Sequence, residues 1–215
     1  MTLAVCEIFK SIQGESSRAG LPCIFVRLAG CNLNCSWCDT GYSRTTDDAT
    51  IMSLDDIVSQ VEKLRCRRVE VTGGEPMLQK ETPELLQWLC DAGYEVLIET
   101  NGSMNLEGVD GRVRKIMDIK CPLSGQADSF FPSNVKQLTR TDEVKFVVAG
   151  REDFDYAAGI INKYDLCSIC EVVFSPVMPD MPPRDLAEWI IKSGLDVKLG
   201  LQLHKIIWPD IQRGV

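Results

Sequence analysis

Three cysteines lie close together in a polar, asparagine-rich segment, and their spacing is typical of a metal site. Cys31, Cys35 and Cys38 are separated by three residues and then by two. Three thiolates from one short loop can bind zinc or an iron–sulfur cluster. Structural zinc needs a fourth protein ligand, here His204 or a distant cysteine. A cubane cluster held by three thiolates leaves one iron open to a small molecule. The spacing favours this reactive cluster, with zinc as the alternative.

A second group of candidate binding residues follows a short predicted strand over residues 69–72. Gly73 and Gly74 end this strand, and because they lack side chains their carbonyls can approach an ammonium group closely. Glu75 adds a charge at the carboxyl edge of the predicted sheet, where α/β proteins gather their chemistry. The turn is therefore a candidate binding site for an amino group.

Short β-rich runs alternate with helical patterns and must position both groups. Strands are predicted over residues 3–9, 22–29, 69–72, 95–99, 113–119, 143–148, 171–174 and 197–203. Helices are predicted after the N-cap Ser53, from Thr82 to Gly93, and over residues 151–163 and 184–193. Residues 121–140 lack a helical period, so one connection is expected to be shortened or rebuilt.

This alternation predicts right-handed βαβ units and a parallel sheet. About six units are present, fewer than the eight of a closed barrel, and 215 residues is below the barrel's typical length of ~250. The predicted fold is α/β, a partial (β/α)6 TIM-like barrel with one shortened or modified crossover. Residues 1–215 are expected to form a single domain.

The composition argues against several classes of function. An excess of 31 acidic over 23 basic residues gives a net charge of −8, which disfavours nucleic-acid binding. No apolar run reaches the ~18 residues of a membrane span, and the polar start, with Glu7 and Lys10, is unlike a secretory signal. We therefore expect a cytoplasmic protein that binds neither membranes nor nucleic acid. Its other seven cysteines are expected to be reduced and mostly buried, with Cys167 and Cys170 structural despite their redox-motif spacing.

The cysteine segment, with its aromatic Trp37, and the Gly-Gly-Glu-Pro turn together resemble the radical S-adenosylmethionine (SAM) superfamily. This resemblance implies a 4Fe-4S cluster on the three cysteines, with SAM chelating the fourth iron. Reductive cleavage of SAM would give a 5′-deoxyadenosyl radical that abstracts a hydrogen atom from the substrate. For Lys120, in Asp118-Ile119-Lys120, an ordinary ion pair is the alternative to a SAM contact. The implied SAM contacts are Trp37, Cys38, Asp39, Gly73, Gly74, Glu75, Lys120 and Ser175.

Other segments resemble one family within this superfamily, the 7-carboxy-7-deazaguanine synthases. They are Ile12-Gln13-Gly14-Glu15, Arg27, Cys38-Asp39-Thr40 and Gln202-Leu203-His204-Lys205. The resemblance covers essentially the whole chain. It implies conversion of 6-carboxy-5,6,7,8-tetrahydropterin to 7-carboxy-7-deazaguanine with loss of ammonia, for queuosine or other 7-deazapurines. It also implies regeneration of SAM, Mg²⁺ held by the Thr40 hydroxyl, a low-potential electron donor such as flavodoxin or ferredoxin, and a homodimer.

The substrate site implied by this resemblance combines a cation with hydrogen-bonding groups. Arg27 suits a substrate carboxylate, because an unpaired charge in the apolar run of residues 24–28 would be costly. His204, the only histidine, is expected at the end of the last strand, where its protonation could tune substrate binding near neutral pH. The full set of predicted substrate contacts is Ile12, Gln13, Gly14, Glu15, Arg27, Thr72 and His204.

Two other functions remain open on the sequence alone. An activating enzyme that installs a glycyl radical on a partner protein shares the cluster and the Gly-Gly-Glu-Pro turn, but it is not expected to combine the segments around Gln13 and His204. A metal-stabilised binding or electron-carrier module would not need the turn at Gly73. The short cluster motif lacks an insertion that some synthases carry, and the tail after Pro209 has no assigned role.

Overall fold

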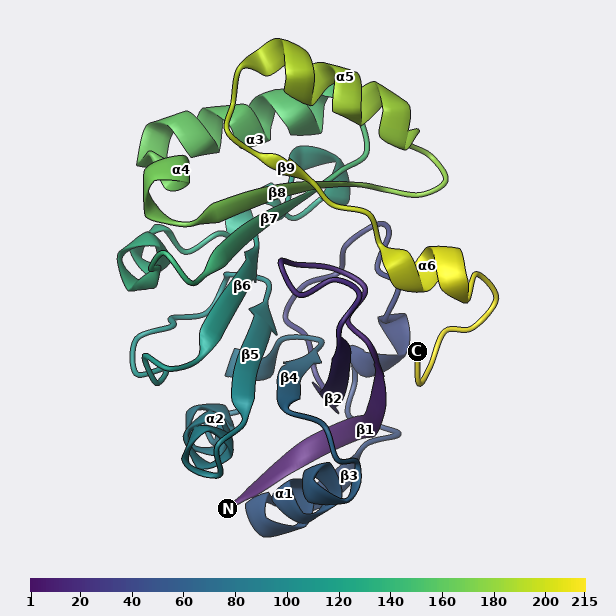
Figure 1. The fold of residues 1–215 in the computed structure, drawn as a ribbon, viewed down its shortest axis with the longest axis vertical. Helices are drawn as coiled ribbons and strands as arrows, with labels where there is room; N and C mark the ends of the chain where they lie inside the picture. The colour runs from purple at the N-terminus through teal and green to yellow at the C-terminus, as the bar shows by residue number, and fades with distance from the viewer.

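A single curved sheet of nine strands, in the order β3-β1-β2-β4-β5-β6-β7-β8-β9, organises the protein in the computed structural model, which describes residues 1–215 (Figure 1). Seven strands run parallel, and β1 and β3 are antiparallel additions at one edge. The outermost strands do not pair, so the predicted partial, TIM-like barrel is confirmed. The strands are β1 (Thr2–Ile12), β2 (Pro22–Leu28), β3 (Thr50–Ser53), β4 (Arg68–Gly73), β5 (Glu95–Thr100), β6 (Arg114–Asp118), β7 (Glu143–Val148), β8 (Glu171–Pro176) and β9 (Lys198–Leu199).

Helices cover the outer face of the sheet (Figure 1). The predicted cap of α1 is present, since Ser53 Oγ accepts a hydrogen bond from the Asp56 backbone N–H at 3.1 Å. The helices are α1 (Leu54–Lys63), α2 (Thr82–Asp91), α3 (Arg151–Tyr164), α4 (Leu166–Ile169), α5 (Pro183–Ser193) and α6 (Leu203–Ile207). None of them is long and apolar enough to cross a membrane.

Side-chain alternation along the strands separates an apolar outer face from a polar inner face. In β4, Val69 and Val71 belong to the core under α1 and α2, whereas Glu70 and Thr72 point to the inside. In β7, Val144 and Phe146 belong to a second core under α3 to α5, and Lys145 points inward. The inner face is therefore built for polar chemistry.

Three predictions of the local structure needed correction. The rebuilt connection at 121–140 is confirmed as three 3₁₀ turns, but the β5–β6 connection also lacks a helix. The edge strands β1 and β3 make the sheet mixed, because the short β1–β2 loop allows only an antiparallel pair. The strand predicted at 197–203 was too long: only Lys198–Leu199 pairs with β8, and the chain then leaves the sheet to form α6.

Candidate active site

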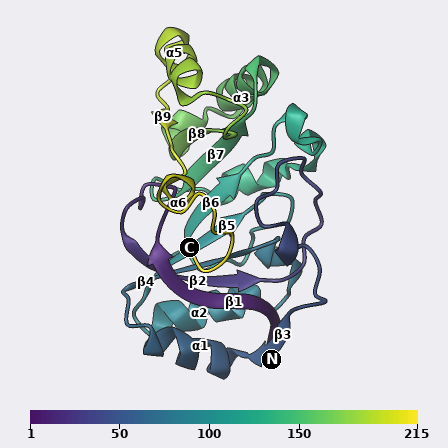
Figure 2. The ribbon, with the colours of Figure 1, turned by 90° about the vertical axis from the view of Figure 1, so that its right-hand side faces the viewer.

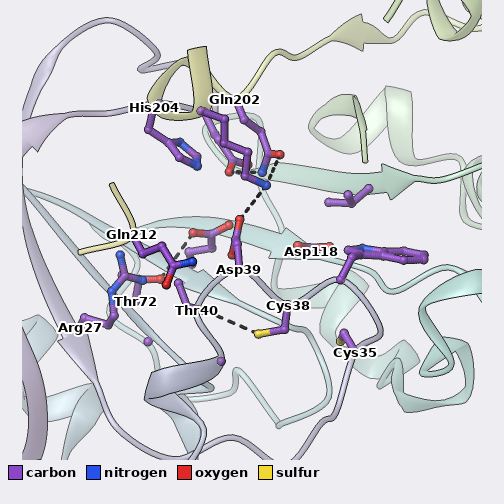
Figure 3. Close-up of a pocket in the computed structure, with 18 of the residues that line it drawn as sticks. Arg27, Cys35, Cys38, Asp39, Thr40, Thr72, Asp118, Gln202, His204 and Gln212 are labelled. Carbon is purple, nitrogen blue, oxygen red and sulfur yellow. Dashed lines mark hydrogen bonds and ion pairs between the residues drawn. The ribbon is translucent and has the colours of Figure 1, made fainter. Parts of the chain in front are cut away.

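One cavity of about 840 Å³ lies at the carboxyl ends of the parallel strands and along their inner face. This volume is at the upper end of the roughly 300–1,000 Å³ of ligand pockets. Figure 3 shows Arg27, Thr72 and Gln212 on the left of the view, and Cys35 and Cys38 on the right. Most residues singled out in the sequence line it: Ile12, Gln13, Gly14, Glu15, Arg27, Cys31, Cys35, Trp37, Cys38, Asp39, Thr40, Thr72, Gly73, Gly74, Lys120 and His204.

The cysteine loop follows β2 and contributes all three thiols to the cavity. Cys31 and Cys35 are half-buried and Cys38 is exposed. The backbone N–H of Leu33 donates to Cys31 Sγ at 3.4 Å, and Asn101 Nδ2 donates to the same sulfur at 3.9 Å. Burial raises the pKa of the Cys31 and Cys35 thiols. Because metals bind thiolates, metal binding here must release protons.

The two glycines of the turn after β4 are required by close packing against this loop. Gly73 has φ +151°, and a Cβ there would lie 2.1 Å from the Leu28 carbonyl oxygen. A Cβ on Gly74 would lie 2.3 Å from the Gly30 oxygen and 2.7 Å from Cys31 Cβ. Any side chain would therefore push the turn away from the cysteine loop.

Two predicted SAM contacts do not line the cavity. The fully buried Glu75 carboxylate accepts hydrogen bonds from Thr100 Oγ1 at 2.9 Å and from the Asn101 N–H at 2.7 Å. It therefore supports the end of β5 instead of facing a ligand. Ser175 is 1% exposed and lies against Gly200, whose Cβ, if present, would be 2.9 Å from Ser175 Oγ. The close approach of the chain at Gly200 covers this serine.

The β1–β2 loop crosses the amino end of the partial barrel. The Ser17 N–H donates to Glu143 Oε2, at the start of β7, at 2.9 Å. Arg18 Nε lies 2.7 Å from Glu95 Oε1, at the start of β5. These contacts hold the segment 13–15 beneath the cavity.

α6 fills the gap between the C-terminal edge of the sheet and β1 (Figures 1 and 2). The Leu203 N–H donates to the Gly14 oxygen at 2.9 Å, and Gln202 Nε2 donates to Glu15 Oε1 at 2.7 Å. A Cβ on Gly14 would lie only 2.3 Å from His204 Nδ1. The expected place of His204 at a strand end was wrong: it lies on α6, packed against the Gly14 backbone.

A cluster of buried charges on the inner face was not predicted from the sequence. Lys145 Nζ lies 2.6 Å from Glu15 Oε2 and 3.5 Å from Asp118 Oδ2, and it also pairs with Glu99. Burial by itself would raise the pKa of Glu15, but attraction to Lys145 and hydrogen bonds from Lys145 and Gln202 lower it to about 2. A lysine within the apolar strand 143–148 was the signal that could have revealed this cluster.

A second carboxyl group beside this cluster has a pKa that is shifted in the opposite direction. Gln13 Nε2 donates to Glu70, which is 1% exposed. Burial and the nearby Glu99 charge raise the pKa of Glu70 well above its usual range. The cavity therefore holds two nearby carboxyl groups whose pKa values are shifted in opposite directions, Glu70 upward and Glu15 downward.

The two cations predicted to bind anionic groups already have partners. Arg27 Nε lies 2.8 Å from Glu7 Oε1, so the premise that its charge is unpaired was wrong. Lys120 Nζ lies 2.8 Å from Asp118 Oδ2, which is the ordinary ion pair considered as its alternative. Both cations still line the cavity.

α6 and the tail after Pro209, which had no predicted role, complete the cavity wall. Lys205 Nζ on α6 lies 2.8 Å from Asp39 Oδ2 of the cysteine loop, and this cation lowers the pKa of Asp39 against the effect of burial. The Arg213 guanidinium lies 4.2 Å from the Tyr42 ring centroid, and Val215 lines the cavity. α6 and the tail therefore contact the cysteine loop on the two sides of Thr40, α6 at Asp39 and the tail at Tyr42.

Comparison with known proteins agrees with this arrangement. The model of the Radical SAM superfamily matches residues 25–190. A 7-carboxy-7-deazaguanine synthase from Koribacter versatilis is 43% identical, covering 99% of this chain and 100% of the relative. A second, from Chlorobaculum tepidum, is 44% identical over 99% of this chain and 97% of its own. The chain belongs to the 7-carboxy-7-deazaguanine synthase family of the radical SAM superfamily. The crystal structure of QueE from Escherichia coli shares the fold, with a TM-score of 0.79 and 21% identity over 95% of both chains.

Membership of the radical SAM superfamily implies a 4Fe-4S cluster and SAM. No three His, Cys, Asp or Glu side chains in this family member meet at a point that could hold one metal ion. A cluster instead takes each thiolate at a different iron, so its ligands surround it. Cys31, Cys35 and Cys38 line one cavity, and N–H groups reach the Cys31 sulfur. These features fit a cluster held by the three cysteines.

Proposed function

We propose that this protein converts 6-carboxy-5,6,7,8-tetrahydropterin to 7-carboxy-7-deazaguanine and ammonia, in queuosine or other 7-deazapurine biosynthesis. The observation that carries this proposal is the single cavity in which the cysteine loop faces Gln13, Glu15, Arg27 and His204. A pterin needs hydrogen bonds to its amide and amine edge and a cation for its carboxylate, and these residues supply both.

The residues around the cysteine loop are suited to hold SAM. We assign its contacts to Trp37, Asp39 and the backbone at Cys38, Gly73 and Gly74, with Lys120 for its carboxylate. Glu75 and Ser175 do not line the cavity, so they support the residues that form its wall and do not contact SAM directly. When bound, the cluster and SAM supply the one-electron chemistry that removes and returns the hydrogen atom at C6 of the substrate.

The substrate is held by groups whose charge is set by their surroundings. The Arg27 guanidinium can take the pterin carboxylate in a two-point hydrogen bond. The ionised Glu15 can accept from the N–H groups of the pyrimidine edge, and Gln13 can donate or accept beside it. Thr72 and His204 line the same cavity and complete the pocket.

Several finer features belong to this proposal. A Thr40 hydroxyl next to a substrate carboxylate suits Mg²⁺, which keeps most of its water ligands. We also propose a low-potential electron donor such as flavodoxin or ferredoxin, a homodimer, a cytoplasmic location and one domain over residues 1–215. All nine strands belong to one sheet, which supports the single domain.

Anaerobic turnover of the reconstituted protein with SAM, Mg²⁺, a reductant and 6-carboxytetrahydropterin tests the function. Many equivalents of carboxydeazaguanine for each SAM lost are expected, because SAM is regenerated. Cleavage of SAM to 5′-deoxyadenosine without any deazapurine would contradict the substrate assignment and favour an activating enzyme. No SAM cleavage after full cluster reconstitution would contradict the radical chemistry itself.

A further inference from the structure

A β-bulge in β1 turns one acidic side chain toward the predicted substrate cation. Val5 pairs with Leu28, whose side chain lies in the core, and the next pair is Glu7 with Arg27, whose side chain lines the cavity. Cys6 is the extra residue between the two pairs. In a regular strand with no bulge, Glu7 would share the core face of Val5, because residues two apart lie on the same face.

Glu7 fixes Arg27 through one specific nitrogen. Glu7 Oε1 accepts from Arg27 Nε at 2.8 Å, and no other hydrogen bond or ion pair involves the Arg27 side chain. The guanidinium carbon lies 5.8 Å from the Phe9 ring centroid, and Phe9 stacks on Phe25 at 5.1 Å. The side chains therefore define the plane of the guanidinium and leave its two terminal nitrogens without a protein acceptor. Those two nitrogens form an edge that can bind a carboxylate in a fork, and it is the edge that remains once Glu7 occupies Nε.

The same carboxylate oxygen connects Arg27 to the cysteine loop. Tyr42 OH donates to Glu7 Oε1 at 2.7 Å. Tyr42 lies two residues after Thr40, the residue assigned to Mg²⁺. The Arg213 guanidinium of the tail stacks over the Tyr42 ring, 4.2 Å from its centroid. Glu7 thereby links the strand of Arg27, the loop of Thr40 and the C-terminal tail.

We propose that Glu7 is a positioning residue for recognition of the substrate carboxylate. It holds the Arg27 guanidinium with its terminal nitrogens available to that carboxylate, and through Tyr42 it keeps Thr40 at a constant distance from them. This role rests on the proposed function, because it requires a substrate that carries a carboxylate. Glu7 does not line the cavity, so it acts through Arg27 and does not touch the substrate.

The test compares two ligands on the reconstituted holoenzyme: 6-carboxytetrahydropterin and tetrahydropterin, which lacks the carboxylate. Glu7→Ala is expected to raise the Kd of the first by about ten- to hundredfold, the effect of losing a charge-assisted hydrogen bond. The Kd of the second should change by less than about threefold. Glu7→Gln should recover most of the difference, since its amide oxygen can still accept from Arg27 Nε. Glu171→Ala, which removes a strand carboxylate paired with Lys198 away from the cavity, is the matched control and should change neither Kd.

The role of Glu7 would be overturned if Glu7→Ala raised the Kd of both pterins equally, or raised neither Kd. Iron content and visible absorption show whether Glu7→Ala still folds around its cluster. If it does not, Tyr42→Phe decides, because it removes only the hydroxyl: a selective loss for the carboxylated pterin supports the proposal, and an unchanged ratio refutes it. Wild-type turnover is measured first, and an absence of deazapurine there contradicts the proposed function independently of Glu7.

Discussion

Replacing Lys145 with methionine removes the only cation at the centre of the buried charge cluster. Its ammonium group lies 2.6 Å from Glu15 and 3.5 Å from Asp118, and it pairs with Glu99 as well. The side chain is 5% exposed, so water cannot replace it easily. Methionine keeps the length of the side chain but leaves Glu15 and Glu99 without a cation, whereas Asp118 keeps its ion pair with Lys120.

We expect the Lys145→Met change to lower the free energy of unfolding by about 3–5 kcal/mol near neutral pH, the usual cost of breaking a buried ion pair by removing one partner. In a protein of this size, 1 kcal/mol corresponds to about 2–4 °C in Tm. The Tm should therefore fall by roughly 6–20 °C. Lys198→Met, which breaks an exposed pair with Glu171, should lower it by only a few degrees, since such pairs contribute about 0–1 kcal/mol.

The destabilisation should also depend on pH in a defined direction. In the wild type, the pKa of Glu15 is held at about 2, below its ordinary 4.5. Its stabilising contribution is therefore complete above pH ~4.5 and is lost as the pH falls toward ~2. Without Lys145, burial dominates and raises this pKa, so the folded variant loses stability as the pH rises through the new value. The difference between wild type and variant should be larger at pH 8 than at pH 5.5.

The assay is anaerobic thermal unfolding of the holoenzyme at one scan rate and at both pH values, with iron content measured on the same samples. Lys145→Arg, which keeps the charge, should lose much less stability than Lys145→Met. An equal fall in Tm at pH 5.5 and pH 8, or a fall no larger than that of Lys198→Met, would refute the reasoning about this cluster.

Three further changes test the cavity. Gly14→Ala should raise the KM for the pterin by about tenfold or more, because the new methyl would lie 2.3 Å from His204 Nδ1 and displace α6; an unchanged KM with normal iron content would contradict this. Cys38→Ala should abolish assembly of a stable 4Fe-4S cluster, measured as iron per chain and visible absorption, and full wild-type iron would contradict the ligand assignment. Thr40→Val should raise the Mg²⁺ concentration for half-maximal activity by about tenfold, whereas an identical Mg²⁺ titration would remove Thr40 from the metal site.

The local motifs could be recognised from the sequence because their requirements are local. Three thiols within eight residues must lie near one another in any fold, and the paired glycines indicated a close backbone approach that the structure shows. The strand and helix pattern was also readable, since each outer core position repeats with the period of its own element.

Some predicted contacts were misplaced because burial depends on residues far away in the chain. Glu75 turns toward Thr100 and away from the cavity, since the end of β5 offers it hydrogen bonds. Ser175 is covered because Gly200 lets the chain pass directly over it. His204 lies on α6, where Gly14 gives it room. None of these partners is near the residue in sequence.

The amino-acid sequence by itself determined the cysteine loop, the Gly-Gly turn, the partial-barrel fold and the family. Only the tertiary structure decided how the inner face is charged. Lys145 meets Glu15 and Glu99 because β7, the β1–β2 loop and β5 point their alternate residues at the same space. Glu7 reaches Arg27 because one extra residue at Cys6 reverses the facing of β1. Such encounters follow from register and sheet curvature, which long-range packing sets and which no local pattern records.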